Sequence, residues 1–133
     1  MKKNIEKEIE LLNKNDAPDN AIYSALLKKI DFEIDKDFLE FIKMYDGAEG
    51  NIGNNNYISF WNTEQLITLN PYYEYNKDCE ELFFFGTDGS NLGYAFEKKN
   101  GQIISIDFLD ISQIQPDVIA DTFELFLSEL SNN

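Results

Sequence analysis

The spacing of apolar residues predicts three helices in the first third of the chain. Ile5, Ile9 and Leu12 recur at helical intervals, and the turn-forming residues 15–19 then end the first helix. Asp35 is expected to cap the third helix, because a carboxylate accepts hydrogen bonds from the free N–H groups of a first turn. The predicted helices run over 5–12, 22–29 and 36–45.

Beyond Gly47 the pattern becomes strand-like. Residues 48–56 are rich in Gly and Asn without periodicity, which predicts a loop. Thr63 resembles a helix start, and Pro71 is expected to keep this connector helix short. The predicted strands run over 57–61, 82–85, 92–96 and 102–108.

Two further signals predict the secondary structure of the C-terminal third of the chain. The dipeptide Asn100-Gly101 predicts a hairpin with a type I′ turn between the last two strands. Pro116 and Asp117 are expected to open a closing helix. Its apolar residues, which share one helical face, are Ile119, Phe123, Phe126, Leu127 and Leu130.

The order of these elements predicts an α+β fold, since no repeated strand-helix-strand unit demands a parallel sheet. We expect residues 1–133 to form a single domain with N-terminal helices and an antiparallel β-meander. A short connector helix interrupts the strands, and a C-terminal helix packs on the sheet. At 133 residues the chain is long enough to bury a core of its own.

Composition supports a folded protein and restricts its partners. Hydrophobic residues make up 43% of the chain and aromatic residues 14%, which is too apolar for a disordered chain. The net charge of -14 repels phosphate backbones and anionic lipid headgroups, so neither nucleic acid nor membrane is an expected partner. The residues after Gly47 hold 3 of the 11 lysines but 14 of the 25 acids.

The residue types that usually carry catalysis are scarce. The chain has no His and its basic residues are all Lys, so the usual neutral-pH acid–base group is missing. Cys79 lies beside Asp78, Glu80 and Glu81, whose charges disfavour a reactive thiolate. We therefore expect neither an enzyme nor a cofactor or metal. With no signal-peptide pattern and no long apolar run, a cytoplasmic location is expected.

The Gly-rich segment 86–93 allows two interpretations. Glycines let backbone amides approach a phosphate, but this segment lacks Lys and Arg and joins two strands rather than opening a helix. With Asp88 as its one carboxylate it also lacks the ligands of a calcium loop. A plain turn is the favoured interpretation.

A tyrosine-rich stretch before the second strand is the leading candidate for partner binding. Tyrosines offer contact area with a polar tip, and neighbouring acids would select a basic partner. The alternative is that these tyrosines pack on the sheet, as Trp61 is expected to do. The candidate residues are Tyr72, Tyr73, Tyr75, Asp78, Glu80 and Glu81, with Asp88, Asp107 and Asp110 as a second, weaker patch. Asp107 and Asp110 could also be read as a catalytic carboxylate pair. In so acidic a chain such pairs arise by chance, so a solvent-exposed edge is the favoured interpretation.

Several stretches resemble the SUKH superfamily, in particular the Smi/Knr branch of cell-wall-assembly regulators and bacterial immunity proteins. The similar residues are the helix 38–47, Ile58-Ser59-Phe60-Trp61 with the following helix start, and the Gly86-Thr87-Asp88-Gly89 turn followed by 93–96. Together they span roughly Phe32 to Phe108. The chain departs from the family at Ile34-Asp35, where Leu-Pro is usual, and at Asp46-Gly47-Ala48, where Asn-Gly-Gly is usual. These motifs shape turns and carry no chemistry.

The resemblance implies a non-catalytic protein-binding module. Its bacterial members imply a cytoplasmic immunity protein that neutralises a cognate toxin, often a nuclease, whose phosphate-binding surface would be basic. Two alternatives stay open: an intracellular regulatory adaptor of the cell-wall-regulator kind, and an acidic mimic of nucleic acid. A monomer or weak dimer is expected in each case.

Overall fold

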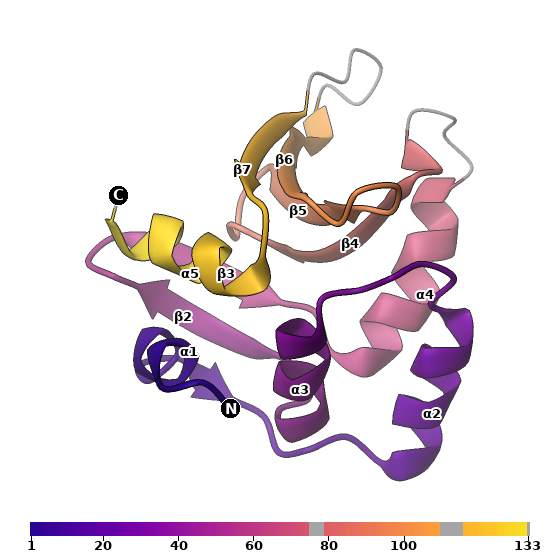
Figure 1. Ribbon diagram of the computed structural model, residues 1–133, viewed down its shortest axis with the longest axis horizontal. Helices are drawn as coiled ribbons and strands as arrows, with labels where there is room; N and C mark the ends of the chain where they lie inside the picture. Colours follow the sequence, from indigo (N-terminus) through magenta and orange to yellow (C-terminus); the bar gives the residue numbers. More distant parts are fainter. Residues whose placement is uncertain (75–78, 110–115, 133) are drawn as a thin grey trace.

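A computed structural model describes residues 1–74, 79–109 and 116–132, and within these ranges it contains helices and one curved sheet (Figure 1). The helices are α1 (Lys3–Glu8), α2 (Asn20–Lys29), α3 (Lys36–Met44), α4 (Thr63–Glu74) and α5 (Phe123–Asn132). The strands are β1 (Asn13–Lys14), β2 (Ala48–Ile52), β3 (Asn56–Phe60), β4 (Leu82–Thr87), β5 (Leu92–Glu97), β6 (Ile103–Asp107) and β7 (Asp117–Ala120).

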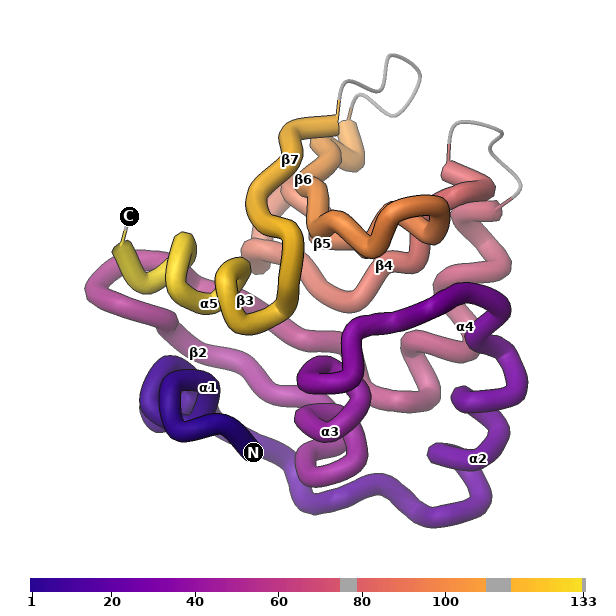
Figure 2. Tube along the Cα trace, viewed as in Figure 1, coloured from indigo at the N-terminus to yellow at the C-terminus, as the bar shows by residue number. Residues whose placement is uncertain are grey.

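The described strands form a single antiparallel sheet in which each strand pairs with its neighbours in sequence, in the order β1 to β7. The α+β meander predicted from the sequence is therefore confirmed, as are its N-terminal helices and its closing helix. Figure 2 shows α2 lying beside α4 at one side of the molecule, while α1 lies near α5 at the other.

The main core lies between one face of the sheet and the helices α3 and α5. Phe38 of α3 packs with its ring centroid 5.3 Å from Phe85 and 5.4 Å from Phe123, and Phe41 lies 4.9 Å from Phe60. All five side chains are buried. Offset and edge-to-face ring pairs of this kind add to the stabilisation from burial alone.

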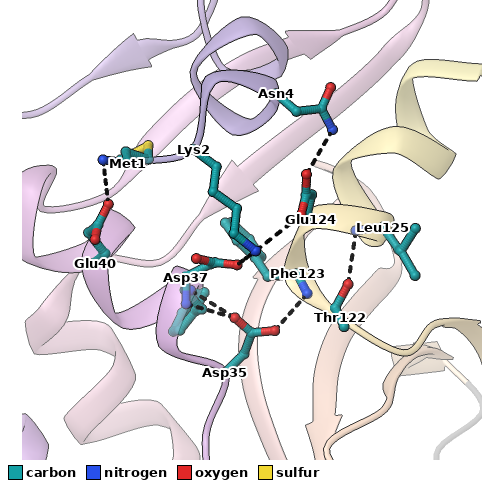
Figure 3. A network of polar contacts seen from close by, with 11 residues as sticks. Met1, Lys2, Asn4, Asp35, Asp37, Glu40, Thr122, Phe123, Glu124 and Leu125 are labelled. Atoms are coloured by element: carbon teal, nitrogen blue, oxygen red, sulfur yellow. Dashed lines mark hydrogen bonds and ion pairs between the residues drawn. The ribbon is translucent and has the colours of Figure 1, made fainter.

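One carboxylate fixes both helices of this core. As predicted, Asp35 caps α3, accepting hydrogen bonds from the backbone N–H groups of Asp37 (2.8 Å) and Phe38 (3.2 Å). Its other oxygen accepts from the N–H of Phe123 at 2.9 Å, in the first turn of α5 (Figure 3). Asp35 thus joins two helix starts that lie 88 residues apart in sequence.

Two predictions at the N-terminal edge of the sheet are wrong. The segment 48–56, expected as a loop, contains β2, which pairs along its whole length with β3. The first helix ends at Glu8, and Asn13–Lys14 form the short edge strand β1 beside β2. The hydrophobic periodicity of the sequence does not reveal β2, because this strand contains Gly and Asn. Its stability comes from pairing with a strand on each side.

Two predictions nearer the C-terminus also need correction. Pro71 lies inside α4, which continues to Glu74 rather than stopping before the proline. Residues 117–120 form strand β7, not the first turn of the closing helix, which starts at Phe123. The buried face expected for that helix is otherwise confirmed at Phe123, Phe126, Leu127 and Leu130.

The predicted hairpin between β5 and β6 is confirmed, but its turn is not type I′. Gly101 has a φ of 76°, whereas no described residue other than glycine has a positive φ, so Asn100 does not adopt the type I′ conformation. The N–H of Gly101 instead donates to the Glu97 carbonyl at 2.8 Å. The N–H of Glu97 donates to the Gln102 carbonyl at 2.8 Å, so the loop between these two residues is the four-residue segment 98–101.

Candidate protein-binding surface

Helix α4 is held against the sheet by the buried side chain of Asn70. Its Oδ1 accepts a hydrogen bond from the backbone N–H of Phe84 at 2.6 Å, and its Nδ2 donates to the Phe84 carbonyl at 3.0 Å. Strand β3 pairs with β4 only at Ser59–Thr87 and Phe60–Gly86. The amide of Asn70 therefore replaces a neighbouring strand at Phe84, where β4 would otherwise have unsatisfied backbone groups.

This attachment places the tyrosines of α4 on the sheet face opposite the main core. The Tyr73 ring lies 4.9 Å from Phe84, 5.2 Å from Phe108 and 6.5 Å from Trp61. The Phe108 ring lies directly over Gly93 of β5, where a Cβ atom would be 2.2 Å from it. A glycine at this position thus leaves room for the Phe108 ring, which reaches Tyr73.

The outer part of this aromatic layer is exposed. Tyr72, whose ring contacts Tyr73 edge-on at 5.4 Å, is 71% exposed, and Leu109, next to Phe108, is 82% exposed. Tyr73 and Phe108 are half-buried between them. We name Tyr72, Tyr73, Phe108 and Leu109 the aromatic patch. Exposed aromatic and aliphatic side chains gathered in one place are characteristic of protein-binding surfaces.

The tyrosines that were predicted to bind a partner have different roles in the structure. Tyr72 is free to contact a partner, whereas Tyr73 packs on the sheet through its half-buried ring, as the alternative interpretation expected. Burial raises the pKa of the Tyr73 phenol, and the neighbouring Tyr72 and Cys79 add to this shift. Trp61 is buried, in agreement with its expected packing role. Tyr75, Asp78 and Asp110 lie outside the described residues.

The predicted acids lie at the two ends of β4. Glu80 and Glu81 are exposed just before its first residue, while Asp88 follows its last residue. Asp107 lies at the Asp88 end, because Asn91 donates from Nδ2 to its carboxylate at 3.1 Å. The structure therefore places Asp107 beside the aromatic patch, next to Phe108.

Part of the acidic charge at the turns has a structural role. Oδ1 of Asp88 accepts hydrogen bonds from the N–H groups of Ser90 (2.9 Å) and Leu92 (3.1 Å), which confirms that 86–93 includes a turn between two strands. Oδ1 of Asp107 accepts from the N–H of Leu109 at 2.9 Å and so fixes the position of Leu109. Among the described residues, no ion pair neutralises Glu80, Glu81, Asp88 or Asp107.

The described residues contain no group of three or more acids or cysteines placed to hold a metal ion. Cys79 is buried. No helix in the described ranges is both long and apolar enough to cross a lipid bilayer.

The family model described as the SMI1 / KNR4 family (SUKH-1) matches residues 17–129, which is most of the chain. This chain belongs to the SMI1/KNR4 family. No curated protein matches it. The SMI1/KNR4 domain is generally a non-catalytic immunity or regulatory domain that binds other proteins. In this member of the family, the glycines of the β4–β5 turn region support aromatic rings on the sheet face that carries the patch.

Sequence analysis missed two members of the patch, Phe108 and Leu109. Phe108 continues the alternation of Ile104 and Ile106, and so was interpreted as the last residue of a buried strand. An apolar pair at a strand end, with an acid directly before it and directly after it, is the signal that the sequence offers. Its proximity to Tyr73 depends on long-range packing, which local spacing cannot show.

Proposed function

We propose that this SMI1/KNR4 protein is an immunity protein that binds and neutralises a basic toxin domain through the aromatic patch. The family supports a protein-binding role, and the lack of His and Arg argues against a catalytic one. The observation that carries the proposal is the chain of ring contacts from the exposed Tyr72 through Tyr73 to Phe108, which is followed by the exposed Leu109. A monomeric protein has little reason to leave such residues together in solvent.

The negative charge around the aromatic patch favours a basic partner. Asp107 beside the patch, with Glu80 and Glu81 at the other end of β4, presents carboxylates that described lysines leave unpaired. With a net charge of -14, the protein attracts a cationic domain over long distances and speeds its association. A nuclease toxin fits this description, because its active surface must be basic to hold phosphates.

Co-expression with a toxin tests the proposal. The probe is the toxin domain encoded directly upstream of this chain's gene, expressed in a susceptible host with and without the chain. We expect protection, and a stable complex of the purified proteins. If the gene has no such neighbour and the chain protects against no adjacent toxin, immunity is contradicted and a regulatory adaptor is favoured.

A further inference from the structure

The sheet face that carries the aromatic patch also has a polar half, formed by β1, β2 and β3. Phe60 points into the main core beside Phe41, so Ser59, its neighbour along the strand, points to the opposite face. The strand registers pair Asn13 with Glu49, Glu49 with Ser59, and Ser59 with Thr87. These side chains therefore form a row across the face that α3 and α5 leave uncovered.

A small hollow of about 180 Å³ lies on this row. Its walls include Ala48 and Phe60, and its polar groups come from Asn13, Asn15, Glu49, Ser59, Asn62 and Gln65. Pockets for drug-sized molecules are usually about 300 Å³ or more, so this hollow suits a single side chain. The described residues that line it include no lysine.

Among the residues that the structure describes, Glu49 is the one charged group that lines the hollow. Its Oε2 accepts a hydrogen bond from the Tyr57 hydroxyl at 2.5 Å, and no described lysine forms an ion pair with it. The bond to Glu49 raises the pKa of the Tyr57 phenol. Tyr57 is 39% exposed, and its ring rests on Gly89, where a Cβ atom would be 2.7 Å from it.

We propose that this hollow receives an arginine side chain from the protein partner. A guanidinium carries five N–H donors, and the hollow presents the Glu49 carboxylate, the Ser59 hydroxyl and the Asn13 and Asn15 side-chain amides. The amide oxygens of Asn62 and Gln65 already accept hydrogen bonds from each other's backbone N–H groups, so they shape the wall of the hollow. The exposed ring of Tyr57 beside Glu49 adds a face for cation–π contact. An anionic group would be repelled by Glu49. The inference rests on the proposed function for its source of the arginine, a basic protein.

The hollow and the aromatic patch can be covered by the same partner. Thr87, at the end of the polar row, pairs with Gly93, and the Phe108 ring of the patch lies on that glycine. The Tyr57 ring packs against Gly89 and the Phe108 ring packs against Gly93. Both glycines belong to the β4–β5 turn region, so this region lies between the hollow and the aromatic patch. The partner surface that follows from this geometry is the whole uncovered sheet face, with an arginine site at one side and an apolar anchor site at the other.

A peptide titration tests the arginine site without the toxin. The probe is N-acetyl-Gly-Arg-Gly-amide, and the matched control peptide carries citrulline, which has nearly the same shape without the charge. Chemical shifts of the ¹⁵N-labelled protein are followed at the backbone of Glu49 and Ser59 and at the Asn13 side-chain amide. We expect saturable shifts at these groups with the arginine peptide and much smaller ones with citrulline.

Variants of the protein complete the test. Glu49→Gln preserves the size of an exposed side chain. It should lower the affinity for the arginine peptide about tenfold, because it removes a charge-assisted hydrogen bond. Glu129→Gln, an equal change at an exposed position of α5, should leave the affinity within about twofold. Equal binding of both peptides, shifts centred elsewhere, or an unaffected Glu49→Gln variant would overturn the arginine site.

The toxin complex separates this inference from the proposed function. If the chain protects cells and binds the toxin, but Glu49→Gln binds as well as the native protein, the arginine site is wrong and immunity stands. If the arginine peptide binds at Glu49 while the chain protects against no adjacent toxin, the site stands as a receptor and immunity is wrong.

Discussion

Asp35 shows how a single residue can connect distant parts of the chain. Its carboxylate caps α3 and also accepts from the first turn of α5, so Asp35→Ala removes hydrogen bonds at two helix starts. We expect the free energy of unfolding to fall by about 2 kcal/mol, since each lost cap costs about 1 kcal/mol. Urea unfolding followed by circular dichroism measures the change.

Asp19 provides a matched control for this prediction. It occupies the N-cap position of α2 but makes no side-chain hydrogen bond there. Asp19→Ala should therefore cost less than about 0.5 kcal/mol. Equal losses in the two variants would show that the double cap does not stabilise the fold.

Tyr94 is a second residue whose environment can be tested, through pH. Its ring packs 5.1 Å from Phe126, and burial raises the pKa of its phenol, with a further contribution from Asp88. The Tyr94 phenol therefore ionises at about pH 10 in the unfolded chain, whereas in the folded protein it is still neutral at that pH. The stability from this group is present below that pH and is lost as pH rises through the folded pKa.

The prediction is that unfolding becomes easier above about pH 10, and that Tyr94→Phe reduces this dependence because phenylalanine does not ionise. Urea midpoints at pH 9 and pH 11 measure it for both proteins. Parallel losses in the native protein and the variant would show that the buried Tyr94 phenol does not contribute.

At the scale of elements, α4 depends on Asn70 for its place beside β4. Asn70→Leu leaves the buried N–H and carbonyl of Phe84 without their side-chain partner. We expect a loss of about 2–3 kcal/mol in the free energy of unfolding, the cost of leaving buried polar groups unsatisfied. Thr68→Ala, an exposed change on the same helix, should cost under about 1 kcal/mol. Similar losses from both changes would contradict the anchoring role.

The elements that sequence predicts well are those with strong local signals. The apolar stripe and Asp35 cap of α3, the aromatic-containing strands β3, β4 and β5, and Gly101 at the hairpin all depend on nearby residues. The edge strand β1 and the strand β2 depend instead on pairing partners far along the chain. The tyrosine stretch was recognised, but Phe108 joined it only through packing across the sheet.

At the scale of the whole molecule, the uneven charge predicts salt-sensitive binding. Glu80→Lys with Glu81→Lys should slow association with the toxin several-fold at low salt and have little effect at high salt, because screening weakens long-range attraction. Glu6→Lys with Glu10→Lys makes the same net change on and just after α1. Stopped-flow mixing at several salt concentrations measures both, and equal slowing by the two pairs would show that only net charge matters.

The central claim is that the aromatic patch binds the partner, and truncating exposed side chains inside and outside the patch tests it most directly. Leu109 is 82% exposed in the patch and Leu11 is 79% exposed elsewhere, so truncating either to Ala should leave the melting temperature nearly unchanged. Calorimetric titration with the toxin should show that Tyr72→Ala with Leu109→Ala costs about 2 kcal/mol or more of binding, while Leu11→Ala costs almost nothing. Undiminished affinity in the patch variant, with its fold intact, would contradict the account.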